Sequence, residues 1–221
     1  LMSYNELQTK LGYSFKNIEL LKLALIHKSY SNTTNNERLE FLGDSILNTV
    51  MSQYLFLKFS NEKEGLLTRM RAYLVKAETL TMKAEELGLI DYIQLSKGTA
   101  NLSRERKNSI LEDSFEATIG AIFLDSGWEQ VNMIVLGIFN NELKHLSADM
   151  SFKDPKTELQ ELLQSMKLDL PIYSIEEIAG GGFNCSVNYD DNIFASSGVT
   201  KRSAETSTAT KVLEYMRNIN D

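Results

Sequence analysis

The sequence predicts an all-α domain followed by a small α+β domain with the element order α-β-β-β-α. Apolar residues recur at helical spacing through residues 3 to about 146. A polar stretch with a proline, LSADMSFKDPKTE at 146–158, then interrupts this pattern. Beyond it, strand-like runs are flanked by two amphipathic segments. We therefore expect domains at 2–147 and 156–221, joined by a linker at 148–155.

Each expected element has its own signal in the sequence. Helical periodicity marks the segments 19–26, 42–59, 66–89 and 110–127, inside which Gly and Pro are scarce. In the second part we expect a helix at 159–166, strands at 171–178, 183–189 and 192–199, and a final helix at 203–219. GGG at 180–182 and DD at 190–191 are typical of turns between strands.

Composition restricts the possible functions. The single cysteine, Cys185, excludes an internal disulfide, and one cysteine with two histidines falls short of the four ligands typical of a structural zinc site. No long uncharged apolar run or signal-peptide pattern is present, so we expect a cytoplasmic protein with no membrane partner. The net charge of −7 argues against a nucleic-acid partner, unless acids that bind metal ions account for part of it.

The segment NNERLEFLGDS, at 35–45, places acids inside an otherwise apolar helical pattern. At helical spacing Glu37, Glu40 and Asp44 fall within an arc of about 60°, opposite the apolar residues. The segment ILEDSFEATIGAIF repeats this arrangement with Asp113 and Glu116, which are i, i+3 neighbours. Two helices are thus expected to carry acids on one face and core residues on the other.

These acids have two interpretations. One is an ordinary solvated face. The other is a metal site, which is favoured because both helices are otherwise strongly apolar and lack a run of Lys or Arg that could neutralise the acids. A further acid, Glu64, precedes another helical segment. Oxygen ligands without His or Cys select Mg²⁺ or Mn²⁺, and such sites suit phosphoryl transfer.

Several motifs resemble those of bacterial ribonuclease III, in the family's order. They are LGYSFKNIELLKLALIHKSYSN, NERLEFLGDS, EGLLTRMRAYLV, SILEDSFEATIGAIFLDSG and DPKTELQELLQ. The C-terminal part is similar to a double-stranded-RNA-binding domain. The resemblance implies an all-α endonuclease domain that works as a homodimer and cleaves double-stranded RNA in a valley between subunits. It also implies Mg²⁺, with Mn²⁺ as a substitute, and no other small-molecule cofactor.

The resemblance also implies roles for individual residues. The metal ligands fall on Glu40, Asp44, Asp113 and Glu116, the catalytic acids on Asp44 and Glu116, and further valley acids on Glu37 and Glu64. Phe41 matches an aromatic residue that inserts into the other subunit. Plain core packing is the alternative, but the helical wheel puts Phe41 beside the acids. Arg38 and Asn48 either orient the carboxylates or simply lie on the helix surface, and His27 and His145 are interpreted as structural.

Hydrolysis in this family implies 5′-phosphate and 3′-hydroxyl ends with short 3′ overhangs, and roles in rRNA and mRNA processing.

In the second domain, Thr157, Gln160 and Glu161 match positions that contact the RNA minor groove, and Lys201 and Arg202 match positions that contact phosphates. The loop AGGGFN, however, has no cation, and Glu205 stands where many such domains have Lys. Residues 153–221 carry 7 Lys and Arg against 11 Asp and Glu, so weak RNA affinity is expected.

Three hypotheses of different classes remain: an active ribonuclease III, a non-catalytic RNA-binding scaffold on the same fold, and an unrelated phosphohydrolase of small substrates. The four acids expected to hold metal are all present, which favours the enzyme over the scaffold. The appended RNA-binding domain argues against small substrates.

Overall fold

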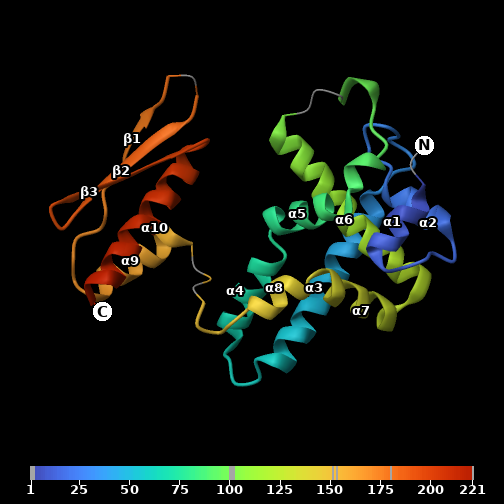
Figure 1. Cartoon of the computed structure of the whole chain (residues 1–221), viewed down its shortest axis with the longest axis horizontal. Helices are drawn as coiled ribbons and strands as arrows, with labels where there is room; N and C mark the ends of the chain where they lie inside the picture. Colours follow the sequence, from blue (N-terminus) through green and yellow to red (C-terminus); the bar gives the residue numbers. More distant parts are fainter. Residues whose placement is uncertain (1–2, 100–102, 151, 153, 180, 221) are drawn as a thin grey trace. The chain divides into compact units, whose positions relative to one another are not determined.

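The computed structural model describes residues 3–99, 103–150, 152, 154–179 and 181–220 (Figure 1). The chain divides into two units, Leu1–Met150 and Ser151–Asp221, and each is described by itself. Some positions used above lie outside the described residues: 2 and 221 at the expected domain limits, 151 and 153 in the expected linker, and 180 in the glycine turn. Among the helices that are described, none is both long and apolar enough to cross a bilayer.

The first unit is built from helices, as the periodicity predicts (Figure 1). They are α1 (Tyr4–Leu11), α2 (Ile18–Ala24), α3 (Glu37–Lys58), α4 (Glu64–Leu74), α5 (Ala77–Leu87), α6 (Arg104–Ser126), α7 (Trp128–Ile138) and α8 (Asn140–His145). Two short 3₁₀ helices, η1 (Leu89–Asp91) and η2 (Lys97–Thr99), lie between α5 and α6. The long helices α3 and α6 contain the two acidic segments.

Both of these helices begin at recognisable signals. The Ser103 hydroxyl accepts a hydrogen bond from the amide of Arg106, which caps α6. Helix α3 begins at Glu37, five residues before the predicted start at 42, so Glu37 and Glu40 lie in its first turn. Because the N-terminal end of a helix carries partial positive charge, carboxylates are favoured there.

Helices α3 and α6 cross with their backbones in close contact. A Cβ atom added to Gly43 would overlap the carbonyl oxygen of Glu116, and one added to Gly120 would overlap the carbonyl oxygen of Leu39. Both glycines are buried at the crossing. The helices can therefore approach this closely only because neither position has a side chain.

The continuous helix predicted for 66–89 is wrong. The chain forms α4 and α5 instead, with a break at Val75 and Lys76, where Lys76 is extended at φ −69° and ψ 152°. Neither Gly nor Pro marks the break. Helix α5 packs on α6 and buries Leu80 and Ala84, so tertiary packing rather than local sequence explains the change of direction.

The second unit confirms the predicted order α-β-β-β-α (Figure 1). Its elements are α9 (Pro155–Ser165), β1 (Ser174–Glu177), β2 (Phe183–Tyr189), β3 (Asn192–Gly198) and α10 (Lys201–Asn220). The sheet is antiparallel with the order β1-β2-β3. Asp190 and Asp191 have φ of 51° and 60° between paired Tyr189 and Asn192, which confirms the predicted two-residue turn.

A hydrophobic core joins the helices of the second unit to its sheet. Leu159 and Leu163, four residues apart on α9, meet Val187 of β2 and Val212 and Met216 of α10, and all five are buried. Four-residue spacing puts each helical pair on one face. This packing leaves the outward faces of the N-terminal turns of α9 and α10 exposed to solvent.

We predict that Gly43→Ala or Gly120→Ala lowers the free energy of unfolding by about 1–3 kcal/mol, because the added methyl group forces the two helices apart. The matched control is Gly137→Ala on α7, where an added Cβ meets nothing within 4 Å. The control should raise stability by about 0.5 kcal/mol, because alanine favours the helix. Chemical denaturation measures all three. Equal stability of the Gly43 and Gly137 variants would contradict the close crossing.

Candidate functional site

The crossing of α3 and α6 brings four predicted acids together. Glu40 and Asp44 from α3 lie within electrostatic range of Glu116 from α6, as does Asp113 on the same helix, and we call these four residues the acid cluster. Glu40, Asp113 and Glu116 are half-buried, whereas Asp44 is exposed. Glu116 interacts electrostatically with the other three members.

Burial and mutual repulsion make full ionisation of the acid cluster unfavourable. Burial is the main cause, followed by the neighbouring negative charges, Asp44 first, and together they raise the pKa of Glu116 to about 8. The pKa values of Glu40 and Asp113 are also raised, again chiefly by burial. The cluster therefore retains a proton near neutral pH unless a cation replaces it.

Two further acids, Glu112 and Glu78, belong to this environment, although neither was predicted as a site residue. Glu112 of α6 is half-buried, and burial, Asp113 and Glu78 of α5 raise its pKa in that order. Helical spacing could have identified Glu112, because it lies one turn before Glu116, about 40° from it on the helical wheel. Glu78 belongs to another helix, so only the tertiary structure relates it to the cluster.

Two basic groups from the loop before α3 also lie near the acids. Lys28 forms an ion pair with Glu37, at 3.3 Å, and its charge opposes the rise in the pKa of Asp113. His27 acts on Asp113 in the same sense. The Nδ1 atom of His27 accepts a hydrogen bond from the amide of Ser29, and burial lowers the pKa of this histidine. The sequence feature that could have identified these basic groups is HKS, at 27–29, shortly before the acidic segment.

Four other residues with predicted roles, Asn48, Arg38, Glu64 and His145, differ in how they relate to the acid cluster. Asn48 donates a hydrogen bond from Nδ2 to the Asp44 carboxylate, at 2.7 Å, so it contacts the acid cluster. Arg38 is exposed on α3. Glu64 begins α4, accepts a hydrogen bond from the Thr68 hydroxyl at 2.7 Å, and lines a pocket between α3 and α4. The Nδ1–H group of His145 donates a hydrogen bond to the carbonyl oxygen of Asn141 on α8, at 2.8 Å, in keeping with a structural role.

Phe41 is not a core residue of this chain. Its side chain is 78% exposed, although it lies on α3 one residue from Glu40 and two from the buried Gly43. A separate apolar pocket of about 610 Å³ lies between α3 and α4 and is lined by Phe56 and Leu67, among others. An exposed aromatic side chain and an open apolar pocket on one helix are typical of a protein–protein contact.

The donor chemistry of the acid cluster fits a hard divalent cation. All four donors are carboxylates, the ligand type that Mg²⁺ and Mn²⁺ prefer. Bound positive charge would also relieve the repulsion that raises the pKa of Glu116. Within the described residues, no three His, Cys, Asp or Glu side chains converge closely enough to hold an ion. Binding would therefore require the carboxylates to turn toward a common point.

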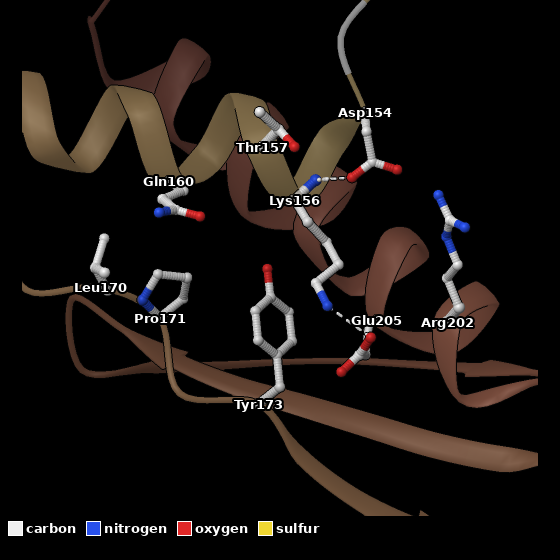
Figure 2. Close-up of a pocket in the computed structure, with 9 residues that line it drawn as sticks. All are labelled: Asp154, Lys156, Thr157, Gln160, Leu170, Pro171, Tyr173, Arg202 and Glu205. Carbon is white, nitrogen blue, oxygen red and sulfur yellow. Dashed lines mark hydrogen bonds and ion pairs between the residues drawn. The ribbon is translucent and has the colours of Figure 1, made fainter.

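The second unit has a pocket at the start of its two helices, shown in Figure 2. Thr157 and Gln160 of α9 and Arg202 of α10 line it, so the structure brings together three residues predicted to contact RNA. Glu161 and Lys201, predicted for the same role, are exposed on the same two helices. The pocket is also lined by six residues that were not predicted to contact RNA: Asp154, Lys156, Leu170, Pro171, Tyr173 and Glu205.

Comparison with known families and proteins gives concordant matches. The Ribonuclease-III-like family matches residues 17–143, and the double-stranded RNA binding motif matches residues 155–216. Proteins named ribonuclease 3 from Vibrio parahaemolyticus and Vibrio cholerae are each 43% identical over 220 residues, covering 97% of this chain and 97% of theirs.

Solved structures agree for the first unit. A nuclease domain of ribonuclease III from Campylobacter jejuni is 41% identical, with a TM-score of 0.61, and the match covers 64% of this chain and 99% of that one. Its description notes structural flexibility in a region involved in dimer formation of that domain. A second structure of the nuclease domain from the same organism has 40% identity and a TM-score of 0.62, and covers 66% of this chain and 100% of that one.

We predict that the stability of the metal-free protein falls as pH rises from about 4.5 to about 8. The pKa of Glu116 is about 8 in the folded chain and ordinarily 4.5, so within this range the folded state binds a proton that the unfolded state releases. Glu116→Gln removes this proton and should flatten the profile and raise stability at pH 8. Urea unfolding in EDTA measures it.

The control is Glu105→Gln, an exposed acid in the first turn of the same helix. It should keep the wild-type pH profile. Parallel pH profiles for wild type and Glu116→Gln would show that burial and neighbouring charges do not raise the pKa of Glu116 in the folded protein.

Proposed function

Because the chain belongs to the ribonuclease III family, whose members are double-stranded-RNA-specific endoribonucleases, we propose that its acid cluster hydrolyses phosphodiester bonds with the help of Mg²⁺. The products would be 5′-phosphate and 3′-hydroxyl ends with short 3′ overhangs. The observation that carries this proposal is the meeting of four carboxylates at the α3–α6 crossing, where the pKa of Glu116 is raised to about 8. Mn²⁺ is the expected substitute, and no other small-molecule cofactor is proposed.

Each member of the acid cluster has a proposed role. Glu40, Asp44, Asp113 and Glu116 would hold the metal ion, and Asp44 and Glu116 would also contact the reacting groups. Bound Mg²⁺ supplies the positive charge that activates water and stabilises the charge developing on phosphate oxygens. The Nδ2–H donated by Asn48 fixes one oxygen of Asp44, which leaves the other oxygen available to the site.

The basic loop before α3 would position the substrate. Lys28 is exposed and lies beside Glu37, at the edge of the acid cluster. An ammonium group there can attract a phosphate of the RNA backbone once metal ions neutralise the nearby acids.

The raised pKa of Glu116 implies that metal binding and proton loss are coupled, since the ligand must be deprotonated.

We propose that the protein acts as a homodimer, with Phe41 inserted into the partner. Support comes from the 78% exposure of Phe41, and from the apolar pocket between α3 and α4, which would receive it. Phe56, 69% exposed, lies at that pocket and would be covered at the same time. Glu37 and Glu64 are exposed and would line the valley between subunits.

The second unit would supply RNA affinity. Thr157, Gln160 and Glu161 would lie along the minor groove, and Lys201 and Arg202, at the N-terminal end of α10, would meet phosphates. We assign catalysis and dimerisation to residues 2–147, RNA binding to 156–221, and a linking role to 148–155. Cytoplasmic processing of rRNA and mRNA precursors is the proposed cellular role.

We predict that Glu116→Gln lowers the rate of duplex cleavage about a hundredfold or more, the scale of losing one transition-state charge contact. Gel assays with a long RNA duplex and Mg²⁺ measure it, with EDTA as the metal-free reference. Duplex binding should be kept, because the second unit is unchanged. Glu105→Gln is the matched control and should cleave normally. Full cleavage by Glu116→Gln, or by wild type in EDTA, would refute the proposed site.

We predict that Phe41→Ala weakens the homodimer by about 2–4 kcal/mol, as expected for a central aromatic contact. Sedimentation equilibrium gives the dissociation constants. The control is Leu124→Ala on α6, which removes another exposed apolar side chain, 55% exposed, and should leave the dimer intact. If both variants dimerise like wild type, Phe41 is not an interface residue.

A further inference from the structure

An ion pair joins the starts of the two helices in the second unit. The ammonium nitrogen of Lys156, near the start of α9, lies 2.6 Å from Oε2 of Glu205 on α10 (Figure 2). The same ammonium lies 4.9 Å from the ring centroid of Tyr173, which forms the base of the pocket. Lys156 is thus held by a carboxylate and an aromatic ring together.

The pair lies among the residues proposed to contact RNA. It borders the pocket of about 500 Å³ that Thr157, Gln160 and Arg202 also line. In Figure 2 the Lys156 side chain extends into this pocket toward Glu205, whereas Arg202 extends beside it without an ion pair to the residues drawn. The side chains of Lys156 and Glu205 are only 34% and 19% exposed. A cation at the RNA-facing end of the domain is therefore directed inward.

We propose that Glu205 limits the RNA affinity of this protein by withholding Lys156 from the phosphate backbone. This inference rests on the proposed RNA-facing surface at the starts of α9 and α10. It adds a determinant of binding strength to that surface, because one of its cations is neutralised inside the domain. Duplex RNA would then meet Lys201 and Arg202 but not Lys156.

The physical case rests on competition for one ammonium group. A charge-assisted hydrogen bond of 2.6 Å is strong, and its partial burial protects it from screening by salt. The Tyr173 ring adds a cation–π contribution in the same place. A phosphate that approached from solvent would have to replace both. Since only neutralised phosphates release counterions, Lys156 in its pair should add nothing to the salt dependence of binding.

The competing interpretation is that the pair is only a clamp that holds α9 against α10. The two interpretations differ in sign for Glu205→Gln. Release of Lys156 should strengthen RNA binding, whereas loss of a clamp should weaken it. Lys156→Met tests a third possibility, that Lys156 already contacts a phosphate. A withheld lysine makes no such contact, so its removal should leave the salt dependence of binding unchanged.

The test is a filter-binding titration of full-length protein on a short RNA duplex over a salt series, in EDTA to prevent cleavage. Glu205→Gln should bind about fivefold more tightly at 0.15 M salt, and the slope of log K against log salt should steepen by about 0.9 per engaged domain. Lys156→Met should keep the wild-type slope. In the double variant, Lys156→Met should abolish the gain made by Glu205→Gln.

Matched variants separate the possible failures. Glu214→Gln removes the same charge from an exposed position further along α10 and should leave the slope unchanged. Lys201→Ala with Arg202→Ala should nearly abolish binding, and unchanged binding in that variant would refute the RNA-facing surface itself. If binding is lost there but Glu205→Gln weakens binding, or Lys156→Met reduces the slope, the withholding role of Glu205 is wrong. A reduced slope for Lys156→Met would overturn the proposal even if Glu205→Gln does not fold.

Discussion

The close crossing of α3 and α6 is the constraint on which the first unit depends. Gly43 and Gly120 allow backbone to meet backbone, and the adjacent turns of the same helices carry Glu40, Asp44 and Glu116. Wider separation of the helices would part the acids and let water between them. The close contact between α3 and α6 therefore both packs the core and brings the carboxylates of the two helices near one another.

That concentration of charge links stability to chemistry. A protein without metal relieves it by protonation, since burial first, and then the neighbouring carboxylates, raise the pKa of Glu116 to about 8. A divalent cation relieves it more completely, because it compensates several carboxylates at once. The repulsion among these carboxylates thus favours metal binding. The second unit offers a contrasting solution, in which Glu205 is neutralised by Lys156.

Local features of the fold could be predicted from the sequence, whereas features that depend on packing could not. The acidic faces of α3 and α6 follow from helical spacing, and the Asp190–Asp191 turn follows from residues that tolerate positive φ. The break at Val75 has no local signal. Lys28 and Glu78 could not be assigned to the acid cluster because only the folded chain relates them to it, whereas the i, i+4 spacing of Glu112 and Glu116 could have identified Glu112. Pairing of Lys156 with Glu205 likewise joins residues 49 positions apart.

The most direct test of the central claim is the number of protons released when Mg²⁺ binds. Isothermal titration calorimetry of the RNA-free protein, in buffers of different ionisation enthalpy, gives this number. A protonated acid cluster that becomes a metal site should release about one proton per subunit at pH 7 and progressively less above pH 8. Glu116→Gln should abolish the release. Mg²⁺ binding without proton release at pH 7, or the same release from Glu116→Gln, would contradict the account.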